Sequence, residues 1–172
     1  AGFIVGRKEL IARLKRNPMK RALRIDKIRL AALEATLKLY RDPDRLAERL
    51  PTVRLLARPK KEIEAAARRL LPLVAQKIGN AFDVAVAACA SQIGSGALPL
   101  ETVPSAGLAI RPRAARGSGR VLSALSTALR RLPVPVVGRI EDKALVLDLR
   151  CLDDEKGFIA NLATLERAGA SD

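Results

Sequence analysis

Residues 134–149 read VPVVGRIEDKALVLDL and predict a β-hairpin. Apolar residues dominate 134–140 and 144–149, and the polar triplet Glu141-Asp142-Lys143 between them is suited to a turn. A helix is expected from Asp153, because apolar residues then recur at the spacing of one helix face, at Phe158, Ile159, Leu162 and Leu165. The stretch therefore predicts two paired strands with a helix packed against them.

The residues before this hairpin continue the alternation of strands and helices. Alternating or short apolar runs predict strands at 53–56, 82–88 and 107–110. Apolar residues at helical spacing predict helices at 59–79 and around 121–129. From residue 52 onward we therefore expect an α+β domain, with helices packed on a mainly antiparallel sheet.

The first forty residues have a different character. Residues 2–6, GFIVG, predict a short buried strand, and residues 7–16 predict a helix that Asn17-Pro18 interrupts. A second helix is expected from Met19 to Tyr40, ended by Asp42-Pro43. A helix of this length either connects two lobes or is an ordinary core helix, and its pattern does not distinguish the two.

Composition excludes several classes of function. The chain has 172 residues, 49% of them hydrophobic, so it can form a core and is not a disordered basic tail. Without His, it forms no Ser-His or Cys-His catalytic pair and no Cys/His zinc site. Cys89 and Cys151 are too few for a disulfide framework and are expected to be small buried side chains in a reducing compartment. Charged residues or Pro interrupt every apolar stretch, so we expect a soluble protein without a membrane span.

Charge is concentrated at the N-terminal end. The formal net charge is +14, and residues 1–30 hold ten basic and two acidic residues, whereas residues 141–172 hold eight acidic and four basic ones. The densest cluster is PMKRALRIDK at residues 18–27, where a helix would place Arg21 and Arg24 one turn apart on one face. Two guanidinium groups so placed are suited to a phosphate or carboxylate. The alternative is a solvated basic surface without a ligand.

Other polar features have simpler explanations. The loop with Gly94 and Gly96 lacks the lysine of a P-loop and the spacing of a dinucleotide site, so a tight turn is expected there. Strand alternation explains Asp148 and Arg150, and helix capping explains the acidic run 153–155. Aromatic residues make up only 2% of the chain, which argues against a base-stacking platform.

Several stretches, in the same order along the chain, resemble the C-terminal part of the bacterial selenocysteine synthase family, the L-seryl-tRNA(Sec) selenium transferases. A series of this kind, spanning almost the whole chain, is much more specific than any single motif. The stretches are AGFIVG (1–6), NPMKRALRIDK (17–27), LAALEATLKLY (30–40), LPTVRLL (50–56), SQIGSGALPLETVPSAGLAI (91–110) and LPVPVVGRIEDKALVLDLRCLDDE (132–155).

The resemblance implies the C-terminal part of a fold-type I transferase that depends on pyridoxal 5'-phosphate. Residues 1–42 would be the end of the large cofactor domain with a long connecting helix, and residues 43–172 the small α+β domain. The implied reaction is that of a cytoplasmic enzyme, which converts seryl-tRNA(Sec) to selenocysteinyl-tRNA(Sec) through an aminoacrylyl intermediate on the cofactor, with selenophosphate as donor. A ring-shaped homodecamer is also implied, with neither a metal nor a membrane.

The resemblance also suggests which residues take part. In the family, the arginines of the KRALR segment help to hold the anionic selenium donor, so Arg21 and Arg24 are the expected substrate-binding residues. The family's cofactor lysine lies a few residues before the AGFIVG stretch and is expected upstream of Ala1. Lys8 and Lys15 do not replace it, because they fall in the following helix. No catalytic residue is expected within this chain, which alone should be inactive.

Two alternatives to an enzyme fragment stay open. One is a stand-alone basic module that binds tRNA or other RNA, which the net charge favours. The other is a module that only assembles oligomers, which the apolar positions around Leu33 and Leu37 favour.

Overall fold

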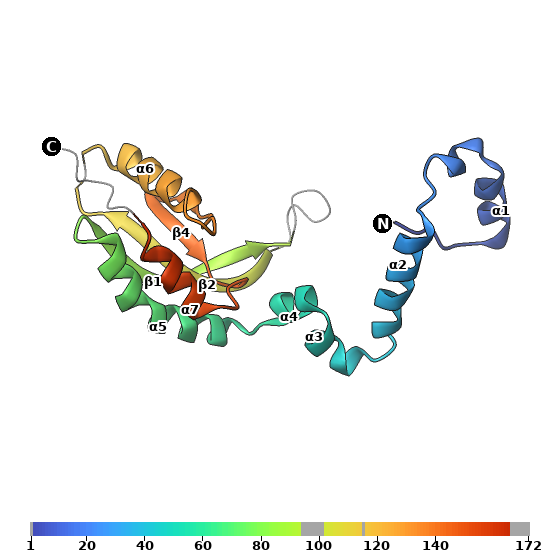
Figure 1. The fold of residues 1–172 in the computed structure, drawn as a ribbon, viewed down its shortest axis with the longest axis horizontal. Coiled ribbons are helices and arrows are strands. Elements are labelled where there is room, and N and C mark those ends of the chain that lie inside the picture. The colour runs from blue at the N-terminus through green and yellow to red at the C-terminus, as the bar shows by residue number, and fades with distance from the viewer. Residues whose placement is uncertain (1, 94–101, 115, 166–172) are drawn as a thin grey trace. The chain divides into compact units, whose positions relative to one another are not determined.

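The structure is a computed structural model that describes residues 2–93, 102–114 and 116–165. The chain divides into two compact units, Ala1–Arg54 and Leu55–Asp172, shown in Figure 1. The glycines of the loop predicted around Gly94 and Gly96 lie outside the described residues.

The first unit consists of short helices. They are α1 (Lys8–Arg16), the 3₁₀ helix η1 (Pro18–Arg21), α2 (Lys27–Leu39), the 3₁₀ helix η2 (Pro43–Arg45), α3 (Leu46–Arg49) and the first residues of α4 (Pro51–Ala57). Neither α1 nor α2 contains a buried residue. The first unit therefore has little core of its own among the described residues.

Three predictions for this region are wrong. Residues 2–6 form no strand, and Phe3, Ile4 and Val5 are exposed, because no other strand in the described part of the unit pairs with them. The helix expected over 19–40 is divided, since the Asp26 carboxylate accepts a hydrogen bond from the Arg29 N–H at 2.9 Å and starts α2 as a separate helix.

The predicted strand at 53–56 is also wrong, because these residues lie in α4. Pro51 occupies the first turn of that helix, where its missing N–H costs no hydrogen bond. The Arg54 N–H donates to the Leu50 carbonyl at 3.0 Å, as in a helical turn. A run of four apolar or basic residues was too short to distinguish a strand from a helix.

The second unit is the predicted α+β domain. It contains α5 (Lys60–Ile78), β1 (Phe82–Gln92), β2 (Thr102–Pro112), α6 (Ser118–Arg130), β3 (Arg139–Glu141), β4 (Ala144–Asp148) and α7 (Glu155–Leu162). The strands form one antiparallel sheet in the order β1-β2-β4-β3. Figure 1 shows α5, α6 and α7 gathered around this sheet.

The main core lies between the helices and one face of the sheet. Strands β2 and β4 contribute side chains of alternate residues, as the two-residue period requires. The helices contribute the apolar stripes that their periodicity predicted. The largest fully buried members are Ile63, Leu70, Val74, Leu108, Ile110, Leu122, Leu129, Leu145 and Leu162.

The hairpin predicted from residues 134–149 is confirmed in β3 and β4, although its first strand is shorter than expected. Asp142 and Lys143 form the two-residue turn, with φ angles of 48° and 57°. Positive φ at both positions is typical of the type I′ turn that matches the twist of paired strands. The hairpin joins the sheet through β4, which pairs with β2 from Gly107 to Ile110.

Gly107 is required where β2 and β4 come closest. A Cβ atom at this position would collide with the carbonyl oxygen of Leu147 on β4, a backbone atom that cannot move without distorting the strand. Gly119, on α6, has no atom within 4 Å of the corresponding point. A side chain is therefore sterically excluded at Gly107 but not at Gly119, so Gly119 can serve as a control position.

We expect Gly107→Ala to lower the free energy of unfolding by at least about 1–3 kcal/mol, because the new methyl group forces the strands apart. Gly119→Ala should raise it by about 0.4–1 kcal/mol, since alanine reduces the entropy of the unfolded chain and favours a helix. Urea denaturation of both variants measures the difference. Equal effects of the two substitutions would contradict the close approach of β2 and β4.

Candidate functional site

The predicted anion-binding residues lie between the α-helices α1 and α2. Arg21 is the last residue of η1, and Arg24 lies between η1 and α2. Asn17 starts η1 by accepting a hydrogen bond from the Met19 N–H at 2.9 Å, and Asp26 then starts α2. The prediction that Arg21 and Arg24 lie one turn apart on one helix face is therefore wrong.

Both arginine side chains remain available to a ligand. Arg21 and Arg24 are exposed, and neither forms a hydrogen bond or ion pair with another residue in the described part of the chain. The nearest acidic residue in sequence, Asp26, already pairs with the Arg29 guanidinium at 3.2 Å. Segment 17–27 is therefore an exposed cationic stretch whose charge is not neutralised locally, as anion binding requires.

A second polar cluster was not predicted from the sequence, and it lies inside the second unit. Arg150, only 2% exposed, follows β4. Its Nη1 donates to the carbonyl oxygens of Leu55 at 3.0 Å, Leu56 at 2.9 Å and Arg58 at 3.0 Å. A buried guanidinium is stable only when its donors are satisfied, and here the backbone that precedes α5 supplies acceptors.

The other side of the Arg150 guanidinium reaches the sheet. Its Nη2 donates to the Pro104 carbonyl on β2 at 2.7 Å, and its Nε donates to the Ser91 hydroxyl on β1 at 3.1 Å. Ser91 in turn donates to the carboxylate of Asp148, which also accepts from Ser105 at 2.7 Å. One hydroxyl thus bridges the buried cation and the carboxylate.

Asp148 is ionised more readily than an ordinary aspartate. Partial burial alone would raise its pKa, but hydrogen bonds from the hydroxyls of Ser91 and Ser105 and from the Arg150 N–H outweigh it, so the pKa is lowered. A negative Asp148 accepts all three hydrogen bonds. The hydrogen bond from the Ser91 hydroxyl therefore helps to keep Asp148 ionised, and the ionised carboxylate in turn holds the Ser91 side chain in place.

Arg58 completes the cluster from the opposite direction. Its Nη1 donates to the carbonyl oxygens of Leu149 at 3.2 Å and Leu152 at 2.9 Å, and more weakly to that of Arg150 at 3.4 Å. Arg58 therefore holds the turn after β4 while Arg150 holds the backbone at Arg58. The two arginines connect the start of the second unit with the end of β4.

The sequence contained a weak signal for this cluster. Asp148 and Arg150 are two polar residues, two positions apart, within an otherwise apolar run. Strand alternation was the predicted explanation, but residues 144–147 of β4 are all buried, and Asp148 at its end is half-buried. Arg150 lies beyond the strand, and its acceptors are up to 95 residues away in sequence, which no local pattern indicates.

The two cysteines differ, and the prediction that both are buried is wrong for Cys151. Cys151 is exposed beside the turn after β4, whereas Cys89 is partly buried on β1. The pKa of the Cys89 thiol is raised mainly by burial, and the negative charge of Asp148 raises it further. Cys89 is therefore a poor nucleophile at neutral pH.

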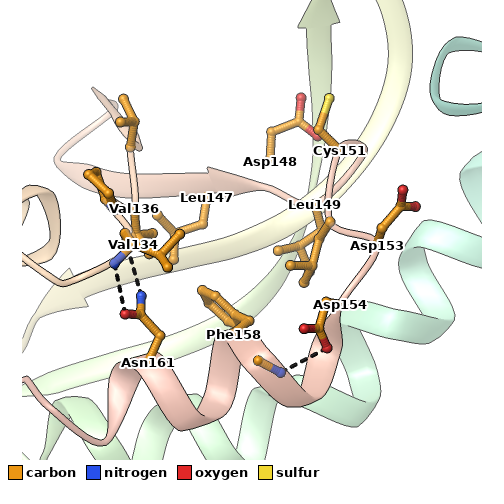
Figure 2. A pocket seen from close by; sticks show the side chains of 14 residues that line it. Val134, Val136, Leu147, Asp148, Leu149, Cys151, Asp153, Asp154, Phe158 and Asn161 are labelled. Atoms are coloured by element: carbon orange, nitrogen blue, oxygen red, sulfur yellow. Dashed lines mark hydrogen bonds between the residues drawn. The ribbon is translucent and has the colours of Figure 1, made fainter. Parts of the chain in front are cut away.

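A pocket of about 480 Å³ lies beside α7 and the turn after β4 (Figure 2). Its walls are mainly apolar, with Phe158 and Leu149 among them, and Asn161 hydrogen-bonds to both the N–H and the carbonyl of Val134. Asp154 accepts the Gly157 N–H at 2.8 Å as the cap of α7, which confirms the predicted capping role. None of the predicted binding residues lines this pocket.

Residues 2–93, 102–114 and 116–165 contain no cluster of three or more His, Cys, Asp or Glu side chains that could hold a metal ion. The helices within these ranges are also too short or too polar for any of them to cross a membrane.

The fold and the site together define an α+β protein with an exposed cationic segment suited to anionic ligands. The chain belongs to the L-seryl-tRNA selenium transferase family, because the model of that family, SelA, matches residues 1–153. This agrees with the resemblance that the sequence stretches indicated.

Curated relatives support the same assignment. The chain is 66% identical to an L-seryl-tRNA(Sec) selenium transferase of Methylocella silvestris over 166 residues, which cover 96% of this chain and 35% of the relative. It is 57% identical to the protein of that name from Rhizobium meliloti, covering 95% and 34%, and 54% identical to that of Escherichia fergusonii, covering 94% and 35%. The chain thus spans about a third of the length of these relatives.

We expect Arg150→Met to lower the free energy of unfolding of the second unit by about 3–5 kcal/mol, because it leaves four carbonyl groups and Ser91 without their buried donor. Arg69→Met is the control: among the described residues, the exposed Arg69 side chain pairs only with Glu155, so its loss should have a much smaller effect. Urea denaturation followed by circular dichroism compares them. Similar losses in both variants would show that the buried cluster does not stabilise the unit.

Proposed function

We propose that this chain is part of an enzyme that converts seryl-tRNA(Sec) to selenocysteinyl-tRNA(Sec) with selenophosphate as the selenium donor. The observation that carries the proposal is the family match over residues 1–153, together with 54–66% identity to proteins named for this activity. Because the chain spans about a third of those relatives, the activity belongs to a longer polypeptide. By itself this chain is expected to be inactive.

Within that enzyme, Arg21 and Arg24 would bind the anionic donor. Their exposure and lack of local ion pairs support this role, as does the ability of a guanidinium to form two parallel hydrogen bonds with a phosphate. Because neither side chain is attached to a regular α-helix, their geometry toward one anion depends on the connection between η1 and α2. Asn17 and Asp26 fix the two ends of that connection.

The family implies pyridoxal 5'-phosphate, a cofactor that stabilises negative charge at the substrate carbon, but the described residues do not fit it. Such a site needs a lysine in a pocket beside a phosphate cradle. Lys8 and Lys15 are exposed on α1, and the 480 Å³ pocket has no lysine in its lining. We therefore infer that the cofactor is held by another part of the enzyme.

We further propose that residues 1–42 complete the large domain of a fold-type I transferase and that residues 43–172 include its small domain. The exposed apolar side chains of the first unit support this division, because a soluble protein rarely leaves so many uncovered: Phe3, Ile4, Val5, Leu10, Leu14, Leu23, Ile28 and Leu30. The expected form is a cytoplasmic, ring-shaped homodecamer.

The alternative is a basic RNA-binding module without catalysis, which the ten basic residues among the first thirty favour. A selenium transfer assay distinguishes the two. The chain matches about a third of the Methylocella silvestris relative, and a chimera is made by replacing that part with residues 1–172. Formation of selenocysteinyl-tRNA by the chimera is then measured. We expect the chimera to be active. A chimera that assembles and binds seryl-tRNA but transfers no selenium would contradict the proposed enzyme.

In this chimera, we expect Arg21→Gln or Arg24→Gln to lower kcat/KM for selenophosphate by about 10- to 100-fold, because each removes a charge-assisted contact to the anion. The KM for seryl-tRNA should stay the same. Arg16→Gln, which removes an exposed charge from the last turn of α1, is the control and should leave both values unchanged. Retention of full selenophosphate kinetics in the Arg21→Gln, Arg24→Gln double variant would refute the assigned role.

A further inference from the structure

Positive charge accumulates in one part of the second unit. Residues 102–140 contain seven arginines and neither Lys, Asp nor Glu. Four of these arginines fall in the sequence RPRAARGSGR at 111–120, which joins the end of β2 to the start of α6. The proposed donor-binding segment 17–27 lies in the first unit, so it does not account for this charge.

Backbone pairing places the first two of the four arginines at one end of the sheet. In the register of β1 with β2, Arg111 lies opposite Asp83, and the Arg113 N–H donates to the Ala81 carbonyl at 3.0 Å. The Arg113 guanidinium also pairs with the Asp83 carboxylate at 2.7 Å, but both side chains are more than half exposed. Water competes with a pair so exposed, so Arg113 can exchange this carboxylate for another anion.

The other charges lie around the start of α6. Arg116 precedes the Gly117 cap, and Arg120 lies in the first turn. α5 carries Lys77 in its last turn and is separated from β1 only by residues 79–81. Figure 1 shows the end of α5 and the start of α6 toward the same side of the second unit. The basic residues at this side, termed the α6 patch, are Lys77, Arg111, Arg113, Arg116 and Arg120.

The charge of the α6 patch is available to a ligand. All five side chains are exposed. Apart from Arg113, none of them forms a hydrogen bond or ion pair with another residue within 2–93, 102–114 and 116–165. The patch therefore presents several cations whose charge the described chain does not neutralise, as a polyanion requires.

The side chains of the patch suit phosphate groups better than a protein surface. Four of the five are arginines, whose guanidinium groups form paired hydrogen bonds with phosphate oxygens. Residues 111–120 contain no large apolar side chain, whereas the centre of a protein interface is apolar and poor in charge. A membrane-binding segment also needs apolar side chains that insert among the lipids. A nucleic acid backbone needs none of them.

Small residues let such a backbone approach closely. At both Gly117 and Gly119, the point where a Cβ atom would stand has no neighbouring atom of the described chain within 4 Å. Residues 111–120 also lack an aromatic side chain on which an unpaired base could stack, so the contacts would go to phosphates and not to bases. Double-helical RNA, whose bases are already paired and stacked, is recognised through its backbone in this way.

We propose that the α6 patch binds the phosphate backbone of double-helical RNA. The inference rests on the proposed function only for the identity of that RNA, which is then a stem of the seryl-tRNA substrate. The two cationic regions have different ligands in this account. Arg21 and Arg24 bind the selenium donor, and the α6 patch binds the RNA, so substitutions in the two regions should affect different substrates.

Binding of a fluorescein-labelled RNA hairpin to the 172-residue chain tests the proposal without catalysis. The double variant Arg116→Gln, Arg120→Gln removes two phosphate contacts. We expect it to raise Kd about 10- to 100-fold at about 0.1 M salt and to reduce the slope of log Kd against log salt by about 2. Arg130→Gln, Arg131→Gln is the matched control, because it removes the same charge from exposed residues at the opposite end of α6. The control should change Kd less than about threefold.

The chimera gives a second readout, which separates this proposal from the proposed function. There, Arg116→Gln, Arg120→Gln should raise KM for seryl-tRNA at least about tenfold and leave KM for selenophosphate unchanged, the reverse of the pattern expected at Arg21. An inactive chimera would contradict the proposed enzyme, but the hairpin comparison would still decide whether the patch binds RNA.

Three results would overturn the proposal. They are equal hairpin affinities of the patch variant and the control, patch-dependent binding to phosphatidylserine vesicles without binding to the hairpin, and an active chimera whose KM for seryl-tRNA is insensitive to the two substitutions.

Discussion

The buried guanidinium of Arg150 is the interaction on which the second unit depends most. Its five hydrogen bonds join the backbone before α5, the end of β1 and the start of β2, segments that are far apart in sequence. Asp148 does not contact the guanidinium directly and is linked to it through Ser91. Because each of the three guanidinium nitrogens has an acceptor, the cost of burying the charge is offset without a direct ion pair.

The sequence predicted those elements whose side chains repeat with a regular period. The apolar stripe of α5 was found because burial follows the helical period there, and the hairpin around Asp142 was found because two apolar runs flank a polar turn. The predictions failed where a single cap or a missing neighbour decides the structure. Asp26 starts a new helix inside an unbroken helical pattern, and residues 2–6 have no strand to pair with. Arg150 was missed because its acceptors are distant in sequence.

The two units differ in how many side chains they bury. In the first unit, Arg21 and Arg24 could be predicted as anion-binding candidates from composition and family resemblance, but their position between two α-helices could not. The described residues of this unit expose many apolar side chains, and none of them is buried. The second unit has its own core and a satisfied polar cluster. The model of the selenium transferase family matches residues 1–153, which include the first unit and most of the second.

The pKa of Asp148, measured by carboxyl NMR titration, tests the central role of this cluster most directly. We predict a value below the ordinary 3.8, because three hydrogen bonds stabilise the carboxylate. A pKa lowered in the folded state adds stability above pH 3.8 that is lost as the pH falls through the folded value. Asp148→Asn should abolish that part of the acid sensitivity. A pKa at or above 3.8 would contradict the account.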